Sequence, residues 1–124
     1  AAFVGAYGVG KAEIFQAVYN EPNANVYLAN YARFAGDHAE HPYIQEIVFE
    51  GFKAFIEFHV LCFAEARQGA QVNFVGSVAK AFEPLLQKAC AEAGVRYGRT
   101  QAKPVNRLVE YHIDVLRVLE PQAL

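Results

Sequence analysis

The sequence predicts a predominantly helical α/β fold with two to three short strands. Apolar residues recur at three- and four-residue steps through most of the chain, which is typical of helices that bury one face. Between Gly69 and Gly76, Val72, Phe74 and Val75 make a short apolar run of β-branched and aromatic residues, which is too short for a helix and predicts a buried strand. A second strand, interrupted by a glycine, is predicted within 94–103. We expect a helical crossover to connect the two strands.

The first helix is expected to end at Tyr7 with Gly8 as its cap, and a new helix opens near Gly10. Gly5, Gly10 and Lys11 also match the spacing of a phosphate-binding P-loop, in which the lysine would contact phosphates. However, position 12 is alanine instead of the Ser or Thr that binds Mg²⁺, and almost no residues are available to build the preceding strand. The helix–turn–helix interpretation is therefore preferred.

A turn rich in asparagine, NEPNAN at 20–25, precedes a helix over 24–35, for which Asn23 is the expected cap. The loop GDHAEHP at 36–42 then places two histidines and two acidic residues within five positions. Imidazole and carboxylate groups bind metal ions, but no further ligand pair supports a site here. We interpret the loop as a solvated connector.

Pro42 begins the longest predicted helix, which extends to about Arg67. Its apolar face is wide enough that we expect contact with another lobe or subunit as well as with the core. The face comprises Ile44, Ile47, Val48, Gly51, Phe52, Phe55, Phe58, His59, Cys62, Phe63 and Ala66. His59 is interpreted as a core histidine. Cys62 is interpreted as a reduced core thiol, as is Cys90 on the next helix.

The helix after the first strand is expected to begin with Ser77 as its N-cap and to end at Gly94, with Pro84 kinking it or splitting off its first turn. A last helix begins at Pro104 and ends before Pro121. The strand, the glycine turn and the helix start present backbone N–H groups and the positive end of a helix dipole. This geometry suits a nucleotide, but many α/β proteins use it only to turn the chain.

Composition limits the classes of partner. A chain of 124 residues with 54% hydrophobic content is expected to form one domain over 1–124. The net charge is −2 with both signs interspersed, which argues against a nucleic-acid partner and a membrane partner. No apolar run approaches the roughly 20 residues of a membrane span, and the first residues lack a signal-peptide pattern. A cytoplasmic location is therefore expected.

Several segments taken together resemble one protein family. The run VNFVGSVAKAFEPLLQKACAEAGVRYGRTQAKPVNRLVEYH is similar to the end of the BadF/BadG/BcrA/BcrD ATPase family, especially its branch of predicted N-acetylglucosamine kinases. In that branch a strand leads into GSVA, a helix, a glycine-bearing strand, a proline and a helix that closes in a Tyr-His pair, here Tyr111 and His112. YGVGKAEIFQAVYNEPNANVYLANYARF, and HPYI followed by Phe52 and Phe55, resemble earlier segments of the family. The likeness covers nearly all of the chain up to about His112.

The resemblance implies the actin-like, sugar kinase and Hsp70 ATPase superfamily, in which two ribonuclease-H-like lobes close over ATP and Mg²⁺. This chain would be part of the C-terminal lobe, with Gly76 and Ser77 beside the adenosine of ATP or ADP and Val78 and Ala79 behind them. The family's phosphate loops, its acidic Mg²⁺-associated residue, its catalytic aspartate and its sugar-binding residues match nothing here. The full-length protein would transfer phosphate from ATP to an amino sugar such as N-acetylglucosamine, with catalytic residues outside this chain.

A second class of function fits the same residues. In this alternative the chain is a non-catalytic helical interaction module or a homodimerisation module. The aromatic face of the helix that begins at Pro42 is then the contact surface, and the turn at Gly76 is only structural.

Overall fold

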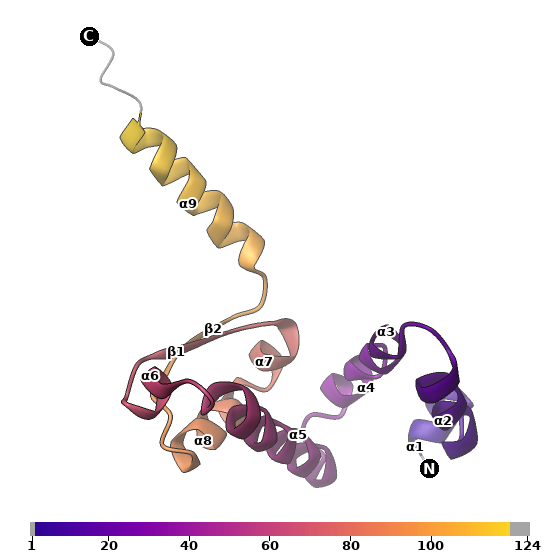
Figure 1. Ribbon diagram of the computed structural model, residues 1–124. Coiled ribbons are helices and arrows are strands. Elements are labelled where there is room, and N and C mark those ends of the chain that lie inside the picture. The colour runs from indigo at the N-terminus through magenta and orange to yellow at the C-terminus, as the bar shows by residue number, and fades with distance from the viewer. Residues whose placement is uncertain (1, 120–124) are drawn as a thin grey trace. The chain divides into compact units, whose positions relative to one another are not determined.

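The computed structural model describes residues 2–119 of the chain (Figure 1). The chain divides into two compact units, Ala1–Gln45 and Glu46–Leu124. The first unit contains the helices α1 (Ala2–Tyr7), α2 (Lys11–Asn20), α3 (Ala24–Ala29) and α4 (Ala32–Asp37). Helix α5 (Pro42–Phe55) begins in the first unit and continues into the second.

The turn between α1 and α2 has the predicted form. Gly8 adopts a φ of 63°, and its N–H donates to the Val4 carbonyl oxygen at 2.8 Å, which closes α1. Gly10 precedes α2, and its N–H donates to the Glu13 side chain at 2.9 Å. A P-loop follows a strand, whereas here the helix α1 precedes Gly10 and Lys11. The P-loop interpretation therefore fails.

The helix predicted over 24–35 is broken into α3 and α4 by a turn at Asn30 and Tyr31. Asn23 is at the predicted N-cap position of α3, but it has a left-handed φ of 63°, and within the described chain its side chain makes no capping bond. Its carbonyl oxygen instead accepts from the N–H groups of Val26 and Tyr27 at 3.0 and 3.1 Å. The left-handed backbone replaces the extended conformation from which an Asn side chain caps a helix.

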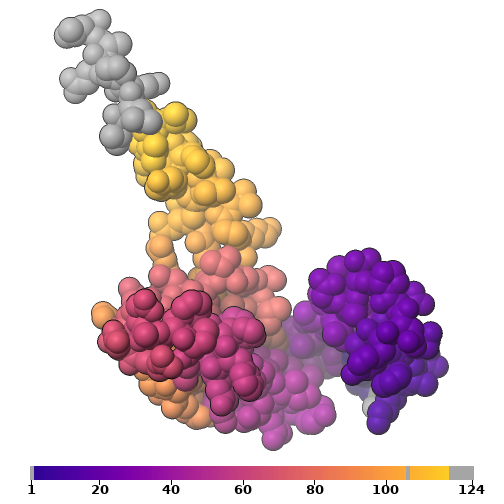
Figure 2. Space-filling model, viewed as in Figure 1, coloured from indigo at the N-terminus to yellow at the C-terminus, as the bar shows by residue number. Residues whose placement is uncertain are grey.

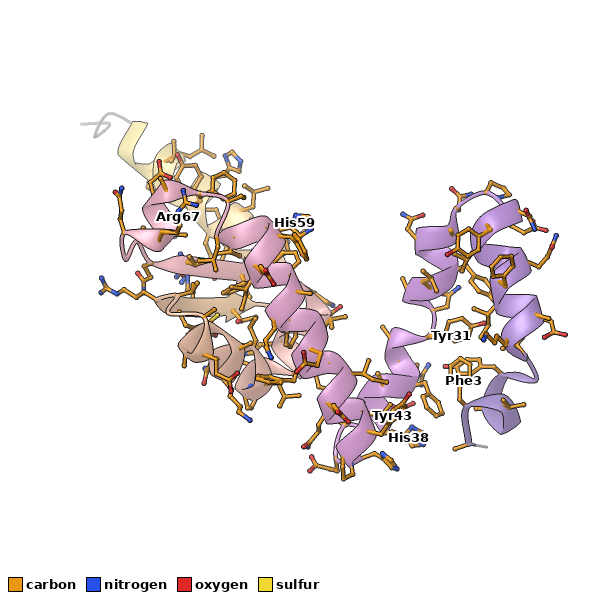
Figure 3. All side chains as sticks on the ribbon, turned by 60° about the horizontal axis from the view of Figure 1, so that its bottom comes forward. Phe3, Tyr31, His38, Tyr43, His59 and Arg67 are labelled. Carbon is orange, nitrogen blue, oxygen red and sulfur yellow. The ribbon has the colours of Figure 1, made fainter. Side chains whose placement is uncertain are left out.

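Aromatic rings hold the first unit together. Tyr31 lies at the centre of the cluster, with its ring centroid 5.0 Å from that of Phe3 and 4.8 Å from that of Tyr7. Figure 3 shows Phe3 and Tyr31 facing one another. His38, from the predicted connector, stacks on Phe34 at 4.0 Å, and its Nδ1 atom lies 2.9 Å from the Phe34 carbonyl oxygen.

In the second unit, α5 continues into a π-helical turn (Ile56–Val60) and then ends, short of the predicted Arg67. Phe63 has an extended backbone with a ψ of 128°, and a separate short helix, α6 (Ala64–Arg67), follows it. The extended residue breaks a sequence pattern that is helical on both sides of it, which is why periodicity alone joined the two segments.

The core side of α5 differs from the predicted one. Ile56 and Val60 are buried, and Phe49 and Phe52 pack against them, at helical spacing along one face. Most of the predicted stripe lies on the adjacent face. Phe58 is 69% exposed, and His59 and Cys62 are exposed as well, so neither is the predicted core residue. His59 points away from the body of the unit (Figure 3), with its ring 5.1 Å from that of Phe55.

The two predicted strands form a parallel pair, β1 (Val72–Val75) and β2 (Tyr97–Gln101), as the helical crossover requires. Val72 lies opposite Tyr97 and Phe74 opposite Thr100, so β2 carries one extra residue between these pairs. Gly98 occupies this irregular stretch, because a Cβ there would collide with the Asn73 side chain. The Asn73 oxygen accepts a hydrogen bond from the Arg99 N–H at 3.1 Å. Gly98, the glycine that interrupts the predicted strand, therefore allows β1 to lie close to the backbone of β2.

The crossover consists of α7 (Ser77–Ala81) and α8 (Glu83–Glu92), divided at Phe82. Pro84 lies in the first turn of α8, so the predicted separation of a first turn is confirmed. The chain leaves α8 at Gly94, which has a φ of 69°, as predicted. There the Gly94 N–H donates to the Ala91 carbonyl at 3.2 Å, and the Val95 N–H to the Cys90 carbonyl at 2.9 Å, which is a Schellman motif.

The core of the second unit lies where α8, β1 and the end of α5 meet. Its largest fully buried side chains are Ile56, Leu86 and Cys90, so the prediction of a core thiol is correct for Cys90. The rest of the core consists of Val60, Ala66, Phe74, Ala89 and Val95. The space-filling view shows these elements as one closely packed body, coloured magenta to orange (Figure 2).

The last helix, α9 (Pro104–Leu119), begins at the predicted proline. Several of its large apolar side chains are exposed, among them Val105, which is 63% accessible, and Leu116, which is 62% accessible. Within residues 2–119, none of the helices has both the length and the apolar character needed to cross a membrane.

A polar network joins α7, α8 and β2. The Lys80 ammonium group donates to Glu83 Oε2 at 2.6 Å, and the Tyr97 hydroxyl donates to Glu83 Oε1 at 2.6 Å. Thr100 Oγ1 lies 2.8 Å from the same hydroxyl. Hydrogen bonds from Lys80 and then from Tyr97 lower the pKa of Glu83, and the bond to Glu83 raises the pKa of Lys80. The network stabilises the charged form of the Glu83 carboxylate.

Replacing Glu83 should make the stability less dependent on pH. A carboxyl group whose pKa is lowered by folding stabilises the protein above its unfolded pKa of about 4.3, and this stabilisation is lost as the pH falls through the folded value. We expect Glu83→Gln to lower the free energy of unfolding at pH 7, and the difference from wild type to shrink as the pH falls below about 4. Urea unfolding between pH 3 and 7 measures this, with the exposed Glu110→Gln as control. A difference that stays constant over this range would contradict it.

Alanine substitutions in the π-helical turn that continues α5 distinguish the buried face from the face predicted to be buried. Ile56→Ala should lower the free energy of unfolding by about 2–5 kcal/mol, because it leaves a cavity in the core. Phe58→Ala, one half-turn away, should change it by less than about 0.5 kcal/mol, because the ring is solvated. Urea unfolding followed by tyrosine fluorescence measures both, and the reverse order would show that the sequence-based face is the buried one.

Candidate functional site

A groove of about 540 Å³ lies over the turn between β1 and α7. This volume is in the range of about 300–1,000 Å³ that small-molecule sites occupy. All of its described lining residues belong to the second unit. They are Val48, Gly51, Phe52, Phe55, Phe74, Val75, Gly76, Ser77, Val78, Ala79 and Leu86.

Gly76 connects the sheet to the helix at this groove. Its N–H donates to the Gln101 carbonyl oxygen at 2.9 Å, which continues the pairing of β1 with β2. Its carbonyl oxygen accepts from the Lys80 N–H at 3.1 Å, which begins α7. Its backbone has a φ of 143° and a ψ of 150°, a region that only glycine adopts without strain. A Cβ at this position would meet no described atom within 4 Å, so the space beside the turn is open.

The prediction that Ser77 caps the helix is wrong, because Gly76 is the N-cap and Ser77 is the first helical residue. An N-cap requires an extended or otherwise non-helical residue, and that conformation falls on the glycine. The N–H groups of Ser77, Val78 and Ala79 precede the first helical donor, Lys80, so helix geometry gives them no acceptor within α7. Within the described chain they make no backbone hydrogen bond to another segment.

The structure brings the four predicted site residues together on one wall of the groove. Ser77 and Val78 are exposed there, whereas Gly76 and Ala79 are half-buried, and Ala79 packs against the core. Phe74 and Leu86, which are buried, lie beneath them.

The second wall comes from α5, and the sequence analysis did not assign it to the site. Val48, Gly51, Phe52 and Phe55 contribute it, and all four belong to the apolar stripe that was predicted to face the core. The width of that stripe was the available indication, because a helix that is apolar over two adjacent faces has more surface than one core contact needs.

The groove suits a flat, weakly polar ring better than an ion. None of its described lining residues is charged, and its polar groups are the Ser77 hydroxyl and the free backbone N–H groups. It therefore offers Mg²⁺ no carboxylate ligand. Across residues 2–119, moreover, no three His, Cys, Asp or Glu side chains are grouped so as to hold a metal ion. Lys80, which follows the turn, is paired with Glu83.

Two other hollows contain none of the predicted residues. The one in the first unit is larger, about 760 Å³, and includes Glu13, Glu21 and Tyr27 in its lining. Glu13 is already bonded to the Gly10 N–H. A smaller hollow of about 330 Å³ lies beside Lys53, Glu57 and Glu92. Volume alone favours the first unit. Of these three hollows, as lined by described residues, the groove over Gly76 combines an uncharged apolar lining with the start of a helix, so we consider it the candidate site.

Comparison with known proteins supports a kinase at the level of the fold. No protein-family model matches the sequence, and no curated protein matches it. Among solved structures, the chain matches the crystal structure of the "Putative N-acetylglucosamine Kinase" from Porphyromonas gingivalis, with a TM-score of 0.77 and 29% identity. The match covers 90% of this chain and 38% of that one, so the chain spans 38% of the length of this relative. Its mostly helical architecture with a small parallel sheet is thus that of part of a kinase-like fold.

Alanine substitution should change the free energy of unfolding in opposite directions at two glycines that line the groove, Gly76 and Gly51. Gly76→Ala should lower the free energy of unfolding by about 1–3 kcal/mol through backbone strain alone. Gly51→Ala should raise it by about 0.5–1 kcal/mol, because alanine is the better residue inside a helix. Neither new methyl group meets a described atom within 4 Å, so steric collision does not affect the comparison. Urea unfolding tests this, and equal changes in the two variants would contradict the assigned backbone of Gly76.

Proposed function

We propose that this chain belongs to the C-terminal lobe of an ATP-dependent sugar kinase or ATPase, and that the groove over Gly76 and Ser77 holds the adenosine of ATP. The observation that carries this proposal is the gathering of Gly76, Ser77, Val78 and Ala79 on one wall of an uncharged groove. These are the residues that the family resemblance assigns to the nucleotide.

The chemistry of the groove fits the adenosine moiety. Adenine has two apolar faces and a polar edge, so apolar walls bury its faces while backbone N–H groups at Ser77 to Ala79 meet its ring nitrogens or the ribose. The described lining offers no positive charge to the triphosphate, which would extend beyond the groove. Mg²⁺, which accompanies ATP in such enzymes, would be held by residues outside this chain.

The whole protein would transfer the terminal phosphate of ATP to an amino sugar, with N-acetylglucosamine as the first candidate. The name given to the solved relative supports this choice of substrate. Phosphoryl transfer depends on positioning and charge stabilisation, and this chain contributes positioning at the nucleotide end. The general base and the sugar site would come from other parts of the protein.

The exposed aromatic and apolar side chains favour a second candidate function, a helical interaction or homodimerisation module. Phe58 and Phe63 are more than 60% exposed, as are Val105 and Leu116 on α9. In that case the groove over Gly76 is structural. The two functions differ in one measurable property, which is affinity for nucleotide.

Calorimetric titration of ADP into the longest natural form of the protein separates them. Ser77→Tyr places a large ring in the groove and should weaken ADP binding by at least about 10-fold, or about 1.4 kcal/mol. Gln87→Tyr adds the same ring on the exposed side of α8 and should leave affinity unchanged.

The alternative outcome is equally definite. ADP binding that is equal in the wild type and in Ser77→Tyr would refute a nucleotide role for the groove. Sedimentation of the same samples would then be expected to show a dimer that dissociates in Phe58→Ala.

A further inference from the structure

We propose that α5 supplies the second half of the nucleotide slot, with Gly51 leaving the space in which the purine ring lies and Phe55 stacking on that ring. The inference rests on the proposed function and extends it to residues that neither the sequence motif nor the comparison assigns. Gly51 and Phe55 are four residues apart, so they lie on the same face of α5, and both line the groove.

Packing does not explain the glycine at position 51. It is the tenth residue of the 14-residue helix α5, a position where glycine is destabilising relative to alanine. A Cβ there would meet no described atom within 4 Å, so no neighbouring side chain excludes alanine. The helical Gly5 and Gly36 are equally open, but of these three Gly51 alone lines the groove. The open volume beside it is the groove itself. A glycine that weakens its helix without relieving a contact is accounted for if something outside the folded chain occupies that space.

Gly51 faces the same groove as Gly76, whose Cβ position is also open. Both lining elements therefore expose bare backbone at the groove, one from α5 and one from the turn before α7. Between the apolar side chains of the lining, these two positions without a side chain leave room for a thin, planar group. A purine has that shape, whereas an aliphatic ligand does not need it.

Phe55 is available for stacking. Its side chain is 48% exposed although it lines the groove, and its centroid lies 5.1 Å from that of His59, one turn along the helix. The neighbouring Phe52 packs against the core and is not free in this way. Stacking of an aromatic side chain on a base typically contributes about 10-fold or more to affinity.

The test measures ADP affinity and unliganded melting temperature in the longest natural form of the protein. Gly51→Leu fills the gap with a good helix former, so ADP binding should weaken at least about 10-fold while the melting temperature is unchanged or higher. Ala54→Leu, on an exposed position of α5 that does not line the groove, is its control. Unchanged ADP affinity in Gly51→Leu would overturn the role of Gly51.

Phe55 is tested by a variant that keeps the volume and removes the ring. Phe55→Leu should weaken ADP binding about 10-fold, Phe55→Tyr should retain wild-type affinity, and Phe58→Leu should have no effect. Equal affinities in Phe55→Leu and Phe55→Tyr would overturn stacking.

The failure of this inference is distinguishable from failure of the proposed function. If ADP binding is weakened by Ser77→Tyr but not by the α5 variants, the proposed role of α5 is refuted and the nucleotide site at Ser77 is retained. ADP binding that none of these variants changes would remove both.

Discussion

The fold of the second unit depends on the backbone of Gly76, which connects β1 to α7. Its N–H completes the pairing of β1 with β2, and its carbonyl oxygen starts α7, so a single residue ends the strand and begins the helix. A two-stranded sheet is only marginally stable alone, and here it is stabilised because the crossover returns α8 onto Phe74. That return requires a sharp turn with a φ of 143°, which strains any residue other than glycine. The same turn leaves one side of the chain uncovered, and this uncovered side is the groove.

Helix α5 shows how one apolar pattern can serve two purposes. Phe49, Ile56 and Val60 face the core, while Val48, Gly51 and Phe55 face the groove, and Phe52 lies between the two sets. A helix with two adjacent apolar faces gives a periodicity that does not say which face is buried. The sequence therefore predicted the helix and its start correctly, and it placed Phe52 and Ala66 correctly at the core, but most of the side chains that it assigned to the core lie on the adjacent face. The buried Ile56 and the exposed His59 could be told apart only from their tertiary contacts.

Local chemistry explains what the sequence could predict. The strand Val72–Val75, the break at Pro84 and the end at Gly94 depend on backbone preferences within a few residues, and all three appear in the structure. Features that join distant segments escaped prediction. Tyr97 reaches Glu83 across 14 positions, and α5 closes the groove from more than 20 residues away. The wall of the groove that includes Gly76 could therefore be predicted from the local sequence. The wall formed by α5 could be identified only from the tertiary structure.

The absence of charge among the described lining residues of the groove limits what this chain can contribute to a reaction. Contacts to adenosine lie far from a transferred terminal phosphate, so they are similar in the ground state and in the transition state. Such uniform binding lowers KM without raising kcat, except where it fixes the position of the phosphate. The groove would therefore act on catalysis through orientation, with its two glycine-bearing walls defining the plane of the base. In the proposed function, a rigid plane at one end of ATP restricts the path of the triphosphate, so this part of the protein would help to determine where the phosphate is transferred.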